Sequence, residues 1–157
     1  LSCVHAGRTQ IGVTHDPVHA EMFWARRGGG AFCNARPIRV AQSQGLHDGT
    51  VGIGYSGRSK PGAMIGLIGA IEARGGLFYR NASGAMSLAM VAAGRLLGYA
   101  EDHMNAWDYL AGQLLVAEAG GRVEDQDAEA AFTAGGPVIV ATPVIWDDLL
   151  AMCEEAF

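Results

Sequence analysis

Acidic side chains gather in one short stretch of the sequence, between Glu101 and Asp108. Glu101 and Asp102 follow the apolar run 96–100, and Asp108 stands at the start of a predicted helix. Carboxylate oxygens are ligands that magnesium prefers, so their convergence predicts a site for a hard cation. Two alternatives involve no ligand: a solvated acidic loop, or an Asp108 that only stabilises the positive end of its own helix.

A second candidate site consists of small residues between a predicted strand at 77–79 and a predicted apolar helix at 83–94. At a helix N-terminus, residues as small as Ser83, Gly84 and Ala85 allow backbone N–H groups to approach an anion. Ser83 is also a common N-cap residue, so helix capping alone is an alternative explanation.

The elements that would position these residues change in kind along the chain. Residues 1–40 contain short apolar runs between turn signals, without a helical period, which predicts an antiparallel meander. From Thr50 onward, strands alternate with helices, which predicts an α/β domain with a largely parallel sheet. The strands are expected at 50–55, 77–79, 96–100, 122–124 and 138–141, and the helices at 62–73, 83–94, 107–119 and 143–156.

This organisation predicts two subdomains, an antiparallel sheet within residues 1–45 and an α/β unit within residues 46–157. Ligands of open α/β sheets bind beyond the carboxyl ends of the strands. Glu101 is expected to end one strand, so the acidic stretch would lie at that edge of the sheet.

Composition excludes several classes of protein. The chain of 157 residues is long enough for one compact domain with a sizeable core. Its formal net charge of −5 argues against a dedicated nucleic-acid surface. We find no apolar run of about 18 residues, so no transmembrane helix is expected. The three cysteines are scattered and odd in number, which predicts buried free thiols and a cytoplasmic location.

Four motifs together resemble the inositol monophosphatase family, in its order and at about its spacing. Trp107-Asp108, Ala111-Gly112 and the run 118–121 (Glu-Ala-Gly-Gly) resemble the family's C-terminal signature. The other three motifs are residues 25–34, 83–85 and 91–95. The resemblance runs from Leu1 to about Val140. It implies a layered α-β-α-β-α sandwich of the sugar phosphatase type, and a homodimer.

The resemblance also implies roles for single residues. Asp108 matches the catalytic aspartate that binds the second magnesium ion, and Glu101 matches a glutamate that hydrogen-bonds a substrate hydroxyl. Ser83 matches a Ser or Thr whose loop, here continued by Gly84 and Ala85, contacts the substrate near its phosphate. The implied function is Mg²⁺-dependent hydrolysis of inositol monophosphate or a related sugar or polyol phosphate. The chain departs from the family by having Ala82 and Gly84 where Gly and Ala are usual.

A larger departure is the absence of the family's main metal motif, Asp-Pro-(Ile or Leu)-Asp-Gly-Thr, from these residues. Asp16-Pro17 is no substitute, because the second aspartate and the Gly-Thr pair are missing. We therefore expect an incomplete chain that lacks most metal ligands. The alternative is a non-catalytic regulatory protein of the same fold that binds a protein partner, as some bacterial members bind transcription machinery. Retention of both Asp108 and Glu101 favours the enzyme.

Overall fold

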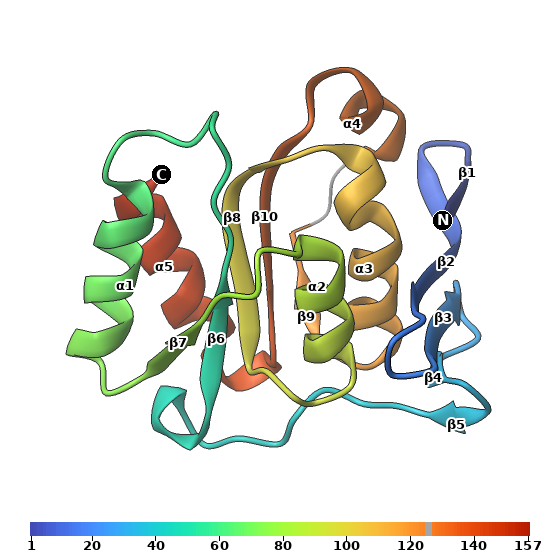
Figure 1. Cartoon of the computed structure of the whole chain (residues 1–157), viewed down its shortest axis with the longest axis horizontal. Helices are drawn as coiled ribbons and strands as arrows, with labels where there is room; N and C mark the ends of the chain where they lie inside the picture. The colour runs from blue at the N-terminus through green and yellow to red at the C-terminus, as the bar shows by residue number, and fades with distance from the viewer. Residues whose placement is uncertain (125–126) are drawn as a thin grey trace.

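The computed structural model describes residues 1–124 and 127–157, and Figure 1 shows two sheets with helices between and beside them. The first sheet is an antiparallel meander in which neighbours in sequence are neighbours in space, as predicted. Its strands are β1 (Ser2–His5), β2 (Arg8–Asp16), β3 (Glu21–Arg26), β4 (Ala31–Cys33) and β5 (Arg36–Pro37).

The second sheet is mixed, which corrects the expectation of a largely parallel sheet. Its strand order is β7-β6-β8-β10-β9; β6 runs parallel to β7 and β8, but β10 runs antiparallel to both β8 and β9. Its strands are β6 (Thr50–Ile53), β7 (Leu77–Tyr79), β8 (Gly98–Met104), β9 (Arg122–Val123) and β10 (Gly136–Ala141). The direction reverses because the connection from β9 to β10 contains a short helix, α4 (Ala128–Ala134), at the end of the sheet (Figure 1). A crossover over the sheet face would be needed to make the two strands parallel.

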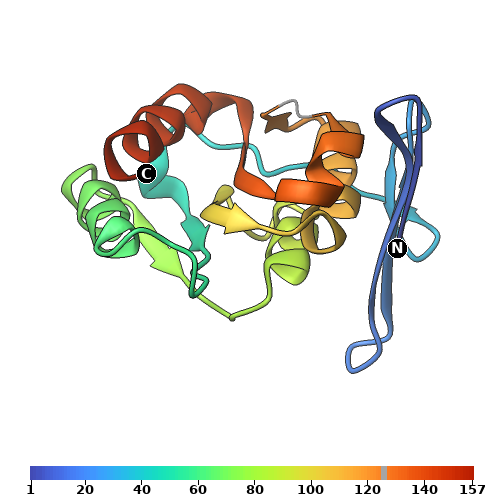
Figure 2. The same cartoon turned by 90° about the horizontal axis from the view of Figure 1, so that it is seen from above.

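The helices form two layers. Figure 2 shows α1 (Ala63–Ala73) and α5 (Trp146–Ala156) on one face of the second sheet, and α2 (Gly84–Ala92) and α3 (Ala106–Glu118) between the two sheets. These four helices agree with the predicted ones, and two 3₁₀ turns, Leu46–Asp48 and Pro143–Ile145, add to them. The described residues thus supply four layers of the expected sandwich, in the order α-β-α-β. The division at residue 45 remains a prediction.

Glycines permit the close packing of the middle layer. A Cβ added at Gly112 of α3 would overlap the side chain of Leu88 of α2. A Cβ added at Gly12 of β2 would lie 2.7 Å from the carbonyl oxygen of Ala111. The Ala111-Gly112 pair of the family signature therefore lets α3 approach both its neighbouring helix and the first sheet.

Glu118, from the same signature, ties α3 to the first sheet. Its carboxylate accepts hydrogen bonds from the backbone N–H groups of Gly28 (2.7 Å) and Gly30 (2.9 Å). A negative charge at the C-terminal end of a helix is unfavourable, so these two charge-assisted hydrogen bonds offset that cost. The motif at residues 118–121 and the motif at residues 25–34 are thus in direct contact in the folded chain.

The cysteines are free, as predicted, but only Cys153 is buried; Cys33 is half-buried and Cys3 is exposed. The expectation that all three thiols are buried is therefore wrong for Cys3, which lies on the edge strand β1. Among the described residues, no helix is long and apolar enough to cross a membrane.

Candidate functional site

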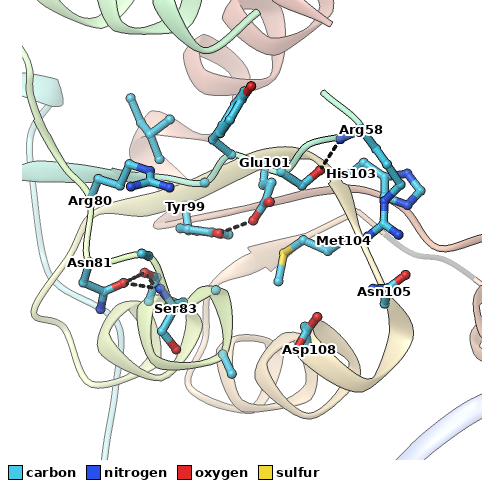
Figure 3. Close-up of a pocket in the computed structure, with 18 residues that line it drawn as sticks. Arg58, Arg80, Asn81, Ser83, Tyr99, Glu101, His103, Met104, Asn105 and Asp108 are labelled. Atoms are coloured by element: carbon cyan, nitrogen blue, oxygen red, sulfur yellow. Dashed lines mark hydrogen bonds between the residues drawn. The ribbon is translucent and has the colours of Figure 1, made fainter. Parts of the chain in front are cut away.

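A cavity of about 250 Å³ lies beside the ends of β6 and β8, between the start of α2 and the start of α3. Figure 3 shows the side chains that line it. Five of the six candidate site residues named from the sequence line this one cavity, and Asp102 does not; the five are Glu101, Ser83, Gly84, Ala85 and Asp108. The fold therefore brings the acidic stretch and the small-residue stretch together.

The small-residue stretch forms a capped helix start. Ser83 is the N-cap of α2, and its Oγ accepts a hydrogen bond from the backbone N–H of Met86 (3.4 Å). Asn81 Oδ1 accepts from the backbone N–H of Ser83 (2.9 Å) and from the hydroxyl of Ser87 (3.0 Å), as Figure 3 shows for the first of these. Capping thus occurs, and it leaves Ser83 at the wall of the cavity.

Ala82 holds a left-handed conformation, with φ of 60°. Residues with a Cβ are disfavoured there by about 1 kcal/mol, and glycine is not. We expect Ala82→Gly to stabilise the chain by up to about 1 kcal/mol, raising the melting temperature by about 2–4 °C. Thermal unfolding followed by circular dichroism measures this. Ala85→Gly inside α2 is the matched control and should lower stability by about 1 kcal/mol; a loss of stability in Ala82→Gly would contradict the argument.

Gly84 explains part of the departure from the family pattern. A Cβ at this position would overlap the terminal methyl group of Met104 and would lie 3.0 Å from the hydroxyl of Tyr99. Met104 is only 4% exposed and lines the cavity. Its flexible thioether thus fills the space that an alanine methyl at position 84 would need.

Glu101 lies within β8 rather than at its end, because the strand continues to Met104, which pairs with Gly136. The side chain is 8% exposed, and the hydroxyl of Tyr99 donates a hydrogen bond to its Oε2 (2.6 Å). Burial raises the pKa of Glu101, the hydrogen bond from Tyr99 lowers it in part, and the charges of Asp102 and Asp108 raise it.

Asp108 is exposed and stands in the first turn of α3. Asn105 precedes that helix as its N-cap, without a side-chain capping bond. Among the described residues, the Asp108 carboxylate has no hydrogen-bond donor and no ion-pair partner. The helix N-terminus favours its charge, but the oxygens remain available to a ligand.

Asp102, unlike Asp108, is bonded within the protein. Its carboxylate accepts hydrogen bonds from the hydroxyl of Ser59 and from the backbone N–H of Lys60 (2.9 Å). It therefore anchors the loop between β6 and α1, and that loop contributes Tyr55 and Arg58 to the cavity. The expectation that Asp102 joins a cluster of ligands gives way to a structural role.

Sequence reasoning missed several residues that line the cavity, among them Tyr99, Arg58 and Arg80. Tyr99 could have been found, because residues two apart on a strand share a face and Glu101 is two positions away. The arginines come from the β6–α1 and β7–α2 loops, and Figure 3 shows them on opposite sides of the cavity. Neither forms an ion pair with a described residue.

The residues fit a magnesium ion only in part. Asp108 offers an unoccupied carboxylate at the cavity, which is the type of ligand magnesium takes. Across residues 1–124 and 127–157, however, no group of three or more His, Cys, Asp or Glu side chains could hold a metal ion. Asp108 alone does not make a metal site.

Comparisons with known proteins place this geometry in context. The pattern of the family described as "Inositol monophosphatase family" matches residues 1–155. An "Inositol-1-monophosphatase" of Mesorhizobium japonicum is 38% identical over 151 residues, and the match covers 95% of this chain and 57% of that protein. A "Nus factor SuhB" of Salmonella typhimurium is 36% identical over 152 residues, with the same two coverages.

The fold has relatives among solved structures. An IMPase of Thermotoga maritima superimposes with a TM-score of 0.86 at 29% identity, over 99% of this chain and 59% of that one. A SuhB of Mycobacterium tuberculosis gives a TM-score of 0.85 at 30% identity, over 98% of this chain and 62% of that one. The chain thus spans little more than half the length of its curated relatives.

Proposed function

Because the chain belongs to the inositol monophosphatase family, we propose that it forms the substrate-binding part of a magnesium-dependent phosphomonoesterase. The substrate would be inositol monophosphate or a related sugar or polyol phosphate. The observation that carries this proposal is the single cavity that gathers Asp108, Glu101 and the capped start of α2.

Each side of the cavity suits one part of such a substrate. The free N–H groups at the start of α2, next to Ser83, favour an anion. Arg58 and Arg80 add positive charge that attracts a phosphate ester. Glu101, a carboxylate that can only accept while it is ionised, suits a hydroxyl of the alcohol part. These contacts would orient the ester, which is a large part of its activation.

Magnesium would supply charge stabilisation on the entering and leaving oxygens of the phosphoryl group. Asp108 is the residue of this chain proposed to bind it. The family's Asp-Pro-(Ile or Leu)-Asp-Gly-Thr motif, which is not among these 157 residues, would supply further ligands. The chain's own contribution is therefore orientation of the ester and one metal ligand.

Phosphate release from inositol 1-phosphate by the 157-residue chain, with and without magnesium, tests the proposal. Release that requires magnesium and is weaker on an alkyl phosphate without neighbouring hydroxyls would support it. If the chain alone releases nothing, the assay is repeated with a chimera in which the upstream segment of the Mesorhizobium japonicum relative precedes Leu1. An inactive chimera that is folded would contradict the proposal.

A second candidate function is binding of a protein partner, and the structure supplies one observation in its favour. Leu77, Phe78 and Tyr79 of the edge strand β7 are 66%, 53% and 39% exposed, although the sequence shows no obvious apolar patch. The similarity to proteins named Nus factor SuhB agrees with such a role. Capture of partners from a bacterial lysate, compared between the chain and Phe78→Asp, tests it. The homodimer stays a prediction from the resemblance, and the cytoplasmic location stays a prediction from the cysteines.

A further inference from the structure

Two buried polar groups meet at the floor of the cavity, the hydroxyl of Tyr99 and the carboxylate of Glu101 (Figure 3). We propose that Tyr99 is a positioning residue: its hydroxyl holds Oε2 of Glu101, so that Oε1 faces the cavity and accepts a hydrogen bond from a substrate hydroxyl. The inference rests on the proposed function, because there Glu101 is the residue that recognises the alcohol part of the ester.

The two side chains are fixed by the elements around them. Tyr99 and Glu101 are two positions apart on β8 and therefore share the face toward α2. A Cβ added at Gly54, just after β6, would overlap both Glu101 Oε2 and the Tyr99 hydroxyl. A Cβ added at Gly84 of α2 would lie 3.0 Å from that hydroxyl. Because Gly54 and Gly84 have no Cβ, the backbone lies close to the pair on two sides. This narrow space restricts the rotamers of both side chains.

The two oxygens of the Glu101 carboxylate differ in their hydrogen bonds. Oε2 accepts from Tyr99, which is itself only 2% exposed. Oε1 has no hydrogen-bond donor among the described residues, and Glu101 lines the cavity. An ionised carboxylate oxygen that lacks a donor, on a side chain that is mostly withdrawn from water, favours a ligand that brings one. The ligand class is therefore a phosphate ester with a free hydroxyl near the ester carbon; a deoxy analogue would leave Oε1 without a partner.

The charges around Glu101 make its ionisation sensitive to Tyr99. Burial raises the pKa of Glu101 most, and the negative charges of Asp102 on β8 and Asp108 on α3 raise it further. The hydrogen bond from Tyr99 and the positive charge of Arg80 lower it. Removing the Tyr99 hydroxyl therefore removes one of the two contributions that lower the pKa of Glu101, and this pKa should rise further.

Tyr99→Phe in the 157-residue chain tests the arrangement without any assay of activity. With glutamate labelled by ¹³C at its carboxyl carbon, the titration midpoint of Glu101 should move upward by about 0.5–1 pH unit. Tyr109→Phe, which removes the hydroxyl of another buried tyrosine, is the matched control and should leave that midpoint unchanged. An unchanged midpoint in Tyr99→Phe would overturn the proposal.

A measurement on the unmodified chain covers the case in which Tyr99→Phe does not fold. The Tyr99 hydroxyl proton should appear as a slowly exchanging signal that is lost when Glu101 is replaced by Ala, which has no acceptor atom. A Tyr99 hydroxyl that exchanges freely in the unmodified chain would also overturn the proposal.

Substrate discrimination links the arrangement to function. Tyr99→Phe should lower kcat/KM for inositol 1-phosphate by about tenfold, roughly the worth of one hydrogen bond to a charged group, and should leave an alkyl phosphate unaffected. Added to Glu101→Ala, which leaves nothing for the Tyr99 hydroxyl to hold, it should have no further effect. Equal loss on both substrates would overturn the proposal. If neither the chain nor its chimera releases phosphate, the proposed function fails, and the titration alone then decides the Tyr99–Glu101 arrangement.

Discussion

Replacement of Asp108 by Asn should lower magnesium-dependent phosphate release by at least about 100-fold, because a metal contributes several kcal/mol of charge stabilisation and each 1.4 kcal/mol is a factor of ten. Asn keeps the size of the side chain but removes the charge that holds the cation. The concentration of magnesium needed for half-maximal rate should rise at the same time. Phosphate release over a magnesium series, in the chain or in the chimera described above, measures both effects.

Asp148→Asn is a matched control for this prediction. Asp148 and Asp108 are each the third residue of their helix, and both are exposed, but Asp148 is not among the residues that line the cavity. Both substitutions remove a favourable charge from a helix N-terminus, which is worth about 0.3–1 kcal/mol of stability. Only Asp108→Asn should affect the phosphate release. Equal activity in the two variants would show that Asp108 is merely a helix-terminal carboxylate.

Replacement of Gly112 by Val should lower the free energy of unfolding by about 2–3 kcal/mol, because the added Cβ would overlap Leu88 where α3 packs against α2. For a chain of this size the melting temperature should fall by about 5–10 °C. Since α2 and α3 each supply residues to the cavity, their separation should also weaken ligand binding. Denaturant unfolding with a two-state fit measures the loss.

Gly69→Val is the control for packing. Gly69 also lies inside a helix, α1, but no atom lies within 4 Å of a Cβ added there. Valine has a slightly higher helix propensity than glycine, so this variant should be neutral or more stable by a few tenths of a kcal/mol. If both glycine variants lose equal stability, the close contact with Leu88 does not matter.

Much of the fold and the location of the site could be predicted from the sequence. Glycine-rich turns marked the meander, and the apolar periods marked α1, α2, α3 and α5. The predicted site residues came together because Ser83 and Asp108 stand at the starts of helices that follow β7 and β8, the two parallel strands on either side of β6. That placement follows from α/β topology, whereas the chemical roles of these residues remain to be tested.

The errors have physical causes. Strand β8 was predicted to end near Ala100 because the apolar run ends there, but backbone pairing with β10 extends it to Met104. Pairing depends on the partner strand and not on the composition of the strand itself. The role of Asp102 was equally hidden, since Ser59 and Lys60 reach it only in the folded chain. The short helix α4 was not predicted, because its alanine-rich stretch has no clear apolar period.

The contact between Glu118 and the glycine-rich turn has a consequence for how the chain opens. The amide hydrogens of Gly28 and Gly30 are bonded to a side chain of α3 and not to a neighbouring strand. They can exchange with deuterium only when the first sheet separates from α3, or when the turn itself opens. Their protection, compared with that of amides paired between β2 and β3, therefore gives a lower limit for the free energy of undocking this sheet. Exchange of these two amides thus probes how firmly the first sheet is packed on α3.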